Sequence, residues 1–216
     1  MRTELNMRVK QRRSPVQQRS RDRFEAIVSA TSQVLRDHGY GQCSTGAIAK
    51  AAGVSKSSLY QYFPDKDAII RVLVERAAAR TRLVIDEHLD ELFCQGRFAP
   101  DPGLQLRLLE ALDEYRDIAS SLIREAPQLA VDRYFMGIEQ RCCDLLRAYV
   151  NSNPDLDFSP AELDALLLVI TASYRAVCHE YLRNDLRPQR ESIAATLFNL
   201  TVGALRGNHE PPASGV

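Results

Sequence analysis

The sequence of 216 residues predicts an all-α fold of about nine helices. Apolar residues recur at helical spacing in almost every long segment, and prolines and glycines separate these segments from one another. The stretch Ser159-Pro160-Ala161-Glu162 is a strong helix start, because it combines a capping box with a proline at the first helical position. We expect an N-terminal three-helix unit followed by a larger C-terminal helical domain.

Residues 44–66 indicate two short helices around a tight turn. Gly53 follows the last periodic residue of the first helix, where a left-handed backbone conformation ends a helix without a Cβ penalty. Ser55 fits the N-cap of the second helix, and Val54 with Leu59 forms a hydrophobic staple across that start. Small residues, a glycine turn and a capped second helix together predict a helix-turn-helix.

The second of these helices, predicted over residues 56–63, has an unusual outer face. Leu59 and Phe63 lie four residues apart and should point inward. A helix that enters the major groove must present hydrogen-bonding groups and positive charge, and must keep carboxylates away from phosphate. A solvated surface helix is the alternative, but such a helix normally carries Glu or Asp as well. The remaining side chains include no acid and are our candidates for contacting DNA: Lys56, Ser57, Ser58, Tyr60, Gln61 and Tyr62.

Several other groups are placed to contact phosphate. Three arginines cluster at the start of the first helix, predicted from residue 19 or 20 to 37, which is the unfavourable end of the helix dipole for a cation. The first turn of the next helix offers backbone amides and a hydroxyl, and a lysine at the start of the fourth helix again opposes the dipole. The residues concerned are Arg19, Arg21, Arg23, Ser44, Thr45 and Lys66.

One ordered run of residues resembles the DNA-binding signature of the TetR family of bacterial transcriptional regulators, within about residues 20 to 75. The run is Thr45-x-x-Ile48-Ala49-x-x-Ala52-Gly53-Val54-Ser55-x-x-x-Leu59-Tyr60-x-Tyr62-Phe63-x-x-Lys66. Many family members carry a glycine and a threonine or another small residue where this chain has Ser57 and Ser58. The resemblance implies phosphate contacts for Thr45 and Lys66, pairing of subunits through the last two helices, and repression that a small molecule relieves.

Charge is divided unevenly along a chain whose formal net charge is zero. Residues 1–66 contain 12 Lys and Arg against 5 Asp and Glu, a balance of +7, and residues 67–216 contain 16 against 23, a balance of −7. Positive charge around the helix-turn-helix favours association with phosphate, while the acidic remainder is kept off DNA. We therefore predict double-stranded DNA as a partner.

Composition and motifs argue against several other classes. No apolar run approaches the ~20 residues needed to span a bilayer, and no signal peptide is recognisable, so we expect a cytoplasmic protein without a membrane partner. Five cysteines without paired spacing fit a reducing compartment. No Ser/His/Asp arrangement, phosphate loop or metal-ligand spacing is visible. We therefore expect no enzyme activity, no metal and no cofactor.

The chain divides into four predicted parts. Residues 1–18 are expected to be a disordered basic arm, 19–66 the helix-turn-helix domain, 67–205 the helical effector-binding and dimerisation domain, and 206–216 a disordered tail. A fourth helix, predicted over residues 66–93, is roughly 40 Å long at 1.5 Å per residue and connects the DNA-binding end to the remainder.

The last two long helices are predicted to pair two subunits. The run from Leu166 to Ile170 is apolar nearly all round, so its helix must be buried on more than one side. Burial inside one subunit would satisfy this requirement, but a four-helix bundle built by two subunits accounts for it better. The predicted interface residues are Leu163, Leu166, Leu167, Ile170, Tyr174, Ile193, Leu197, Leu200 and Ala204.

Polar or aromatic side chains within mostly apolar helices are candidates for an effector pocket. Each of them also fits ordinary core or surface, and Arg124 fits a plain ion pair as well as a contact with an anionic ligand. The candidates are Tyr115, Arg124, Phe135, Met136, Glu139 and Tyr174.

These observations predict a homodimeric DNA-binding regulator with a palindromic operator, and the family resemblance implies a repressor that is released by an unidentified small-molecule inducer. An activator is an open alternative. A redox-responsive regulator is another, acting through Cys142, Cys143 or Cys178, although buried cysteines usually behave as small hydrophobes.

Overall fold

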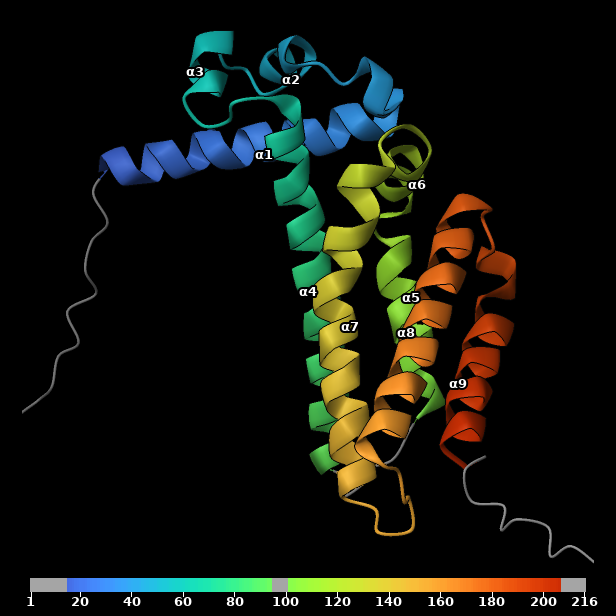
Figure 1. Cartoon of the computed structure of the whole chain (residues 1–216). Coiled ribbons are helices and arrows are strands. Elements are labelled where there is room, and N and C mark those ends of the chain that lie inside the picture. Colours follow the sequence, from blue (N-terminus) through green and yellow to red (C-terminus); the bar gives the residue numbers. More distant parts are fainter. Residues whose placement is uncertain (1–14, 95–100, 207–216) are drawn as a thin grey trace, which may run out of the picture.

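The computed structural model describes residues 15–94 and 101–206, and within these ranges it contains nine α-helices, one 3-10 helix and no strand (Figure 1). This confirms the predicted all-α fold. The predicted disordered segments were 1–18 and 206–216; of these, residues 1–14 and 207–216 lie outside the described residues, whereas residues 15–18 and Arg206 are helical. The helices are α1 (Pro15–Gln42), α2 (Thr45–Ala51), α3 (Lys56–Tyr60), α4 (Lys66–Cys94), α5 (Pro102–Asp113), α6 (Arg116–Glu125), α7 (Pro127–Asn151), α8 (Pro160–Arg183), the 3-10 helix η1 (Arg187–Gln189) and α9 (Arg190–Arg206).

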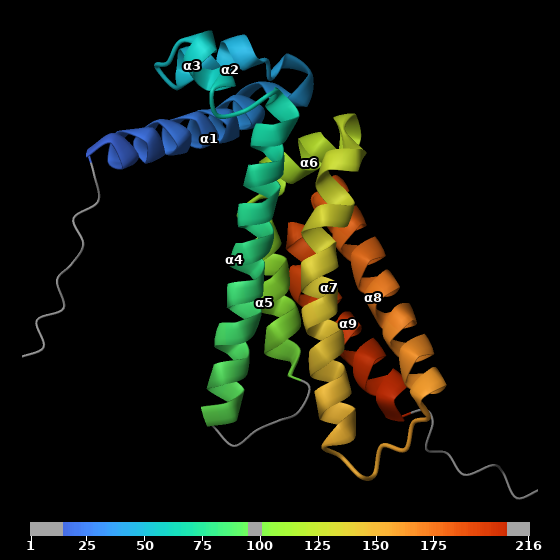
Figure 2. The same cartoon turned by 60° about the vertical axis from the view of Figure 1, so that its left-hand side comes forward.

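The helices form a bundle that is capped at one end (Figures 1 and 2). Helices α1, α2 and α3 lie together at that end, and the long helix α4 descends from it beside α7. Helices α5, α8 and α9 complete the bundle, with α8 and α9 on the side away from α4. Helix α6 packs against α1 and thereby joins the cap to the bundle. None of the described helices is both long enough and apolar enough to span a membrane.

Local capping forms the helix-turn-helix as predicted. The Ser44 hydroxyl caps α2 by accepting a hydrogen bond of 3.1 Å from the Ala47 N–H. Gly53 has a φ of 65°, and the Ser55 hydroxyl caps α3 by accepting from the Ser58 N–H at 3.1 Å. The turn and both helix starts therefore arise from short-range sequence signals.

Two helix boundaries differ from the prediction. Helix α1 begins at Pro15, four residues before the predicted start at Arg19, and proline is favoured in the first turn of a helix. Helix α3 ends at Tyr60, not at Phe63. Pro64 explains this early end, because proline disfavours the helical conformation at the residue before it.

One continuous hydrophobic core joins the cap to the bundle. In the cap, the Phe24 and Phe63 rings have centroids 5.0 Å apart and pack α1 against the segment after α3. The core then passes without a break across the start of α4. Its fully buried members include Ile27, Ile48, Leu59, Ile70, Ile85, Leu109, Leu122 and Tyr181.

Tyr40 joins the end of α1 to α4 and α6. Gly39, with a φ of 73°, interrupts α1 and turns the chain at this point. The Tyr40 N–H donates to the Ser121 hydroxyl at 2.9 Å, and the Tyr40 hydroxyl donates to the Asp67 carboxylate at 3.0 Å. The Lys66 ammonium donates to the Tyr40 carbonyl at 3.1 Å and lies 3.7 Å from the centre of the Tyr40 ring. The backbone groups, hydroxyl and ring of Tyr40 are all used to connect three helices.

Glu125, at the end of α6, provides a second set of contacts to the turn that contains Tyr40. Its carboxylate accepts from the Gly41 N–H at 2.6 Å and from the Ser121 hydroxyl at 3.0 Å. The hydrogen bond from Gly41, followed by that from Ser121, lowers the pKa of Glu125. Because the pKa is lowered on folding, this contact is complete at neutral pH and is lost as the pH falls through the lowered value.

A buried arginine joins α6 to the end of α8. The helical segment that begins with α5 is interrupted at residues 114–115, so that α6 begins with Arg116. The Arg116 side chain is 8% exposed and donates to Asp113 at 2.9 and 3.0 Å and to the Tyr181 carbonyl at 2.8 Å. Its guanidinium lies 4.5 Å from the centre of the Tyr181 ring, and the Tyr181 hydroxyl donates to Asp113 at 2.9 Å. This network fixes the C-terminal end of α8 on α6.

Helix α8 starts at the predicted capping box. The Ser159 hydroxyl accepts from the Glu162 N–H at 3.3 Å, and the Glu162 carboxylate accepts from the Ser159 N–H at 2.9 Å. Pro160 occupies the first turn, where its missing N–H has no helical partner to lose.

Replacing Arg116 with methionine should lower the free energy of unfolding by about 3 kcal/mol, because the Tyr181 carbonyl would lose its side-chain donor and the half-buried Asp113 would keep only the Tyr181 hydroxyl and Arg190 as partners. Urea unfolding followed by circular dichroism measures the change. Arg183→Met, which removes an arginine of α8 that is 57% exposed, is the control. It should change the stability by less than about 0.5 kcal/mol, and an equal loss for both variants would contradict the role assigned to Arg116.

Candidate functional site

The outer face of α3 is exposed and free of carboxylates. Leu59 is fully buried and fixes the rotation of the helix, and Tyr60 is 52% exposed although it is aromatic. Residues 44–64 contain neither Asp nor Glu. Of the predicted DNA-contacting side chains, four are exposed (Lys56, Ser57, Tyr60 and Gln61) and two are half-buried (Ser58 and Tyr62).

The first turn of α2 lies beside this face and extends it. The Thr45 and Tyr60 hydroxyls lie 3.2 Å apart and share a hydrogen bond. A Cβ atom on Gly46 would lie 3.0 Å from Lys56 Cε and 3.3 Å from Lys56 Nζ, so the lysine lies across the first turn of α2. The start of α2, next to the N-cap Ser44, and the outer face of α3 therefore form one surface, which we call the α2–α3 surface.

The first turns of α1 add positive charge to the same end of the molecule. The Tyr62 hydroxyl lies 3.2 Å from Ser20 Oγ, which connects the segment after α3 to this part of α1. The nearby acid Glu25 is paired with Arg76 of α4 through hydrogen bonds of 2.6 and 2.8 Å, and these lower the pKa of Glu25. The predicted arginines on these turns are exposed: Arg19, Arg21 and Arg23.

Lys66 has a different position from the one that we predicted. We expected its charge to face phosphate, but its ammonium donates to the Tyr40 carbonyl and covers the Tyr40 ring. A contact with phosphate would have to compete with these two interactions. The positive charge of Lys66 is unfavourable at the start of α4, and its contacts with Tyr40, 26 positions earlier in the chain, offset this cost.

The helical bundle contains a cavity of about 150 Å³, which we call the main cavity. Helices α4, α5, α7, α8 and α9 all contribute to its lining, most of which is apolar. Along α7 the lining extends from Tyr134 to Tyr149, a distance of about 22 Å at the rise of an α-helix. A cavity of this shape is suited to a small or elongated apolar molecule.

In the described part of the lining, no positively charged side chain is free to bind an anionic ligand. Asp101, Glu139 and Arg175 are the charged residues that line the main cavity. Arg175 is held by Glu139 through two hydrogen bonds of 2.6 Å each. The lining therefore has a formal charge of −1, which disfavours a carboxylate or phosphate inside the cavity.

Two hydrogen-bonded groups interrupt the apolar lining. The Tyr134 and Thr81 hydroxyls lie 2.6 Å apart, joining α7 to α4. On the opposite side, Gln105 Nε2 donates to the Tyr174 hydroxyl at 3.0 Å, and that hydroxyl lies 3.1 Å from Thr201 Oγ1. Burial raises the pKa of both Tyr134 and Tyr174, so both are neutral at physiological pH.

A smaller cavity of about 40 Å³ lies between α4, α6 and α7. Three residues line both cavities and form the wall between them: Leu112, Tyr134 and Phe135. The Tyr134 and Phe135 rings meet edge to face with centroids 5.1 Å apart. The smaller cavity borders Val74 of α4 and Ile118 of α6, so it lies between the two helices that hold Tyr40.

Half of the predicted effector residues line the main cavity. Phe135, Glu139 and Tyr174 do so, and Tyr115 lines the smaller cavity. Arg124 and Met136 line neither cavity, because Arg124 is exposed in the last turn of α6 and Met136 is 67% exposed on the outer face of α7. The structure corrects these two assignments. Sequence reasoning missed Gln105, although a polar residue in the leucine-rich stripe of α5 was a usable signal.

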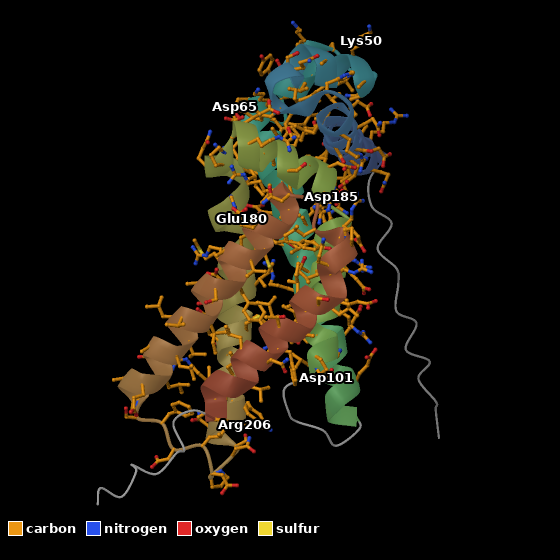
Figure 3. All side chains as sticks on the ribbon, turned by 90° about the vertical axis from the view of Figure 1, so that its right-hand side faces the viewer. Lys50, Asp65, Asp101, Glu180, Asp185 and Arg206 are labelled. Carbon is orange, nitrogen blue, oxygen red and sulfur yellow. The ribbon has the colours of Figure 1, made fainter. Side chains whose placement is uncertain are left out.

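Helices α8 and α9, which face the viewer in Figure 3, carry several exposed apolar side chains. Its most exposed apolar side chains are Leu168 at 69%, Val169 at 60% and Leu200 at 45%. Only Leu200 belongs to the set that we predicted. Of the others, four are buried within the subunit (Leu163, Leu167, Ile170 and Leu197) and four are half-buried (Leu166, Tyr174, Ile193 and Ala204). This corrects the prediction, because the more strongly periodic stripe of each helix packs inside its own subunit.

Of the cysteines that could respond to oxidants, Cys178 is buried, and Cys142 and Cys143 are half-buried. Cys142 and Cys178 both line the main cavity, and burial raises the pKa of each to about 12. Burial also raises the pKa of Cys143. Because the thiolate is the reactive form, these environments disfavour oxidation at neutral pH. Within residues 15–94 and 101–206, no group of three or more His, Cys, Asp or Glu side chains could hold a metal ion.

The α2–α3 surface lies in a stretch of the chain that matches a known family. Residues 27–73 match the family model described as bacterial regulatory proteins of the tetR family. The chain therefore contains a TetR-family domain, which includes the α2–α3 surface.

Individual relatives resemble this chain over different lengths. The HTH-type transcriptional regulator EthR of Mycobacterium tuberculosis (strain ATCC 25618 / H37Rv) is 31% identical over 64 residues, which cover 30% of this chain and only 30% of EthR. EthR of Mycolicibacterium smegmatis is 24% identical over 192 residues, covering 86% of this chain and 87% of that protein.

Solved structures share the fold of this chain at low sequence identity. The dihydroxyacetone kinase operon activator DhaS has a TM-score of 0.64 at 17% identity, covering 85% of this chain and 96% of DhaS. FadR of Bacillus subtilis, solved in complex with stearoyl-CoA, has a TM-score of 0.63 at 17% identity, covering 84% of this chain and 98% of FadR.

Cys142 and Cys178, whose pKa values are raised to about 12, should react with iodoacetamide at pH 8 roughly a hundredfold more slowly, or slower still, in the folded protein than in urea. Mass spectrometry of the labelled peptides measures both rates, and the denatured chain is the internal control. Peroxide should leave DNA binding unchanged. Fast labelling of the folded protein, or a loss of DNA binding in peroxide that a Cys142→Ala, Cys143→Ala, Cys178→Ala variant resists, would contradict the assignment.

Proposed function

We propose that this protein is a homodimeric cytoplasmic repressor that binds a palindromic operator and is released by a neutral, largely apolar effector. The α2–α3 surface carries the proposal, because it is exposed, cationic and free of carboxylates over residues 44–64. A surface of this kind is suited to the major groove, where phosphates surround the base edges that are read.

The side chains of the α2–α3 surface divide into two roles. Lys56, which lies across the first turn of α2, is placed to contact a phosphate together with the Thr45 hydroxyl. Tyr60 and Gln61 extend from the exposed end of α3 and are placed to contact base edges. Phosphate contacts set affinity and position, and base contacts set sequence preference.

Pairing of two subunits through α8 and α9 is supported by their exposed apolar face. Leu168 and Val169 on α8 continue into the small exposed residues Ala172 and Ala176, which allow a second helix to approach closely. Leu200 and Gly203 are exposed on α9. Two such faces related by a twofold axis would form a four-helix bundle and would present two α2–α3 surfaces to one duplex.

The effector is proposed to occupy the main cavity. Its apolar lining favours an apolar molecule, and the formal charge of −1 among Asp101, Glu139 and Arg175 favours a neutral one. FadR of Bacillus subtilis, which shares this fold, is complexed with stearoyl-CoA, a ligand with a long acyl chain. An uncharged aliphatic or aromatic molecule is the class that the lining of this chain supports.

Coupling between the effector and DNA is proposed to run through α4 and α6. Both helices border the smaller cavity, and both are tied to Tyr40 at the end of α1. An effector that favours a different spacing of α4 and α6 would shift the dimer towards a state whose α2–α3 surfaces no longer match the groove spacing.

Activation is a second candidate for the effect on transcription. DhaS, which shares this fold, is an activator of the dihydroxyacetone kinase operon. An in vitro transcription assay with and without the protein distinguishes the two, because a repressor lowers and an activator raises transcript yield. A redox-responsive regulator is less well supported, because burial raises the pKa values of Cys142, Cys143 and Cys178.

Lys56→Gln should weaken binding to operator DNA and reduce the slope of log K against log salt by about 2, because a dimer would lose two phosphate contacts. Fluorescence anisotropy with a labelled operator fragment, selected from random DNA, measures the slope at several salt concentrations. Arg183→Gln, on the exposed surface of α8, should leave the slope unchanged. An unchanged slope in Lys56→Gln would contradict the phosphate contact.

Leu168→Glu should convert the dimer to a monomer and abolish tight operator binding, because two buried carboxylates would face each other across the twofold axis. Light scattering after size-exclusion chromatography measures the mass. Leu83→Glu is the matched control, because Leu83 is 52% exposed on α4, on the other side of the bundle, and this variant should remain dimeric. A wild-type protein that is monomeric at micromolar concentration would overturn the proposed dimer.

A further inference from the structure

Gln105 is a buried amide in the apolar wall of the main cavity. It lies on α5 between Leu104 and Leu108, which line the same cavity, and it is only 6% exposed. Its Nε2 donates to the Tyr174 hydroxyl at 3.0 Å. Among the described residues, its Oε1 has no hydrogen-bond partner although it is buried. An unpaired acceptor in such a place is costly, because the amide has lost its contacts with bulk water.

The hydrogen bonds beyond Gln105 fix which end of its amide is left without a partner. The Thr201 hydroxyl donates its single proton to the Leu197 carbonyl at 3.0 Å. The Tyr174 hydroxyl accepts from Gln105 and lies within 3.1 Å of Thr201 Oγ1 and 3.3 Å of the Leu197 carbonyl, so it donates onward to one of these acceptors. The chain of donors therefore runs from Gln105 towards α9.

Rotating the Gln105 amide by half a turn would break this order. The Tyr174 hydroxyl would then have to donate to Oε1, which would remove its donation to α9. The network thus favours the orientation in which Nε2 faces Tyr174 and Oε1 is left as the acceptor without a donor. A molecule in the main cavity can complete the chain only by supplying a proton to Oε1.

We propose that the effector carries a neutral hydrogen-bond donor, a hydroxyl or an N–H group, which donates to Gln105 Oε1 while its apolar remainder fills the main cavity. This inference rests on the proposed effector role of the cavity and adds the chemical group that is recognised there. An alcohol, a phenol or an amide fits this description. An ether, an ester or a hydrocarbon of the same size lacks the donor and leaves Oε1 unpaired.

Two isomeric probes test the donor directly. 1-Nonanol and 1-methoxyoctane contain the same atoms, but only the alcohol can donate a hydrogen bond. Isothermal titration calorimetry of the wild-type dimer should show tighter binding of 1-nonanol, by roughly tenfold or more, because the alcohol pairs an acceptor that the ether leaves unpaired. Equal affinities would overturn the inference, as would be observed if a water molecule already satisfied Oε1.

Gln105→Met tests whether this residue is the source of the preference. Methionine keeps the length of the side chain and removes the acceptor, so the two probes should bind with similar affinities. Leu108→Met is the matched control, because it changes another wall residue of α5 and should retain the preference for the alcohol. Circular dichroism and operator binding without probe confirm that each variant is folded. A preference that persists in Gln105→Met would overturn the assignment.

The outcomes separate this inference from the proposed function. If both probes bind and release operator DNA equally well, the cavity is an effector site and only the role of Gln105 fails. If neither probe binds to a wild-type dimer that binds operator DNA, the cavity accepts no neutral aliphatic molecule of this size, and the proposed effector class and the inference both fail. The wild-type comparison decides the inference even if Gln105→Met does not fold.

Discussion

The contacts around Tyr40 hold the DNA-binding end of this protein in a fixed position relative to the bundle. The N–H of this residue is bound to α6, its carbonyl and hydroxyl are bound to α4, and its ring lies under Lys66. The end of α1 therefore cannot shift against α4 or α6 without losing at least one of these contacts. At the other end of α6, Arg116 binds the last turn of α8. Helix α6 is thus anchored at both ends, to the helix-turn-helix unit and to the proposed dimer helices. Hydrogen-bonded contacts of this kind are either formed or broken, and a regulator that switches between two states requires such discrete arrangements.

Electrostatics serve opposite purposes at the two ends of the molecule. Around the α2–α3 surface, positive charge is exposed and the nearby acid Glu25 is paired with Arg76, so the field that reaches DNA is not cancelled locally. Within the bundle, Arg175 is paired with Glu139, and the tyrosines remain neutral because burial raises the pKa of Tyr134 and Tyr174. A chain with a formal net charge of zero can therefore have a cationic α2–α3 surface and an interior cavity whose lining has a formal charge of only −1.

The parts of the structure that depend on neighbouring residues were predictable from the sequence, and those that depend on long-range packing were not. The Ser55 cap, the positive φ of Gly53 and the capping box at Ser159 follow from signals a few residues long, and the structure has all three. The position of Lys66 was missed, because its partner Tyr40 lies 26 residues earlier and meets it only after α1 and α4 have packed. The exposed apolar residues of α8 were not predicted for a related reason. Helix α8 is apolar on two sides, and periodicity alone does not tell which side meets the core of its own subunit.

The aromatic wall formed by Tyr134 and Phe135 makes the interior of the bundle a pair of compartments of unequal size. A molecule entering from the larger compartment either stops at the rings or displaces them, since a closely packed wall has no intermediate opening. Within a series of compounds of increasing length, occupancy of the smaller cavity would therefore begin abruptly at one length and would not rise gradually. The length of a bound molecule would therefore determine whether any of its atoms lies beside α6, the helix that holds Tyr40.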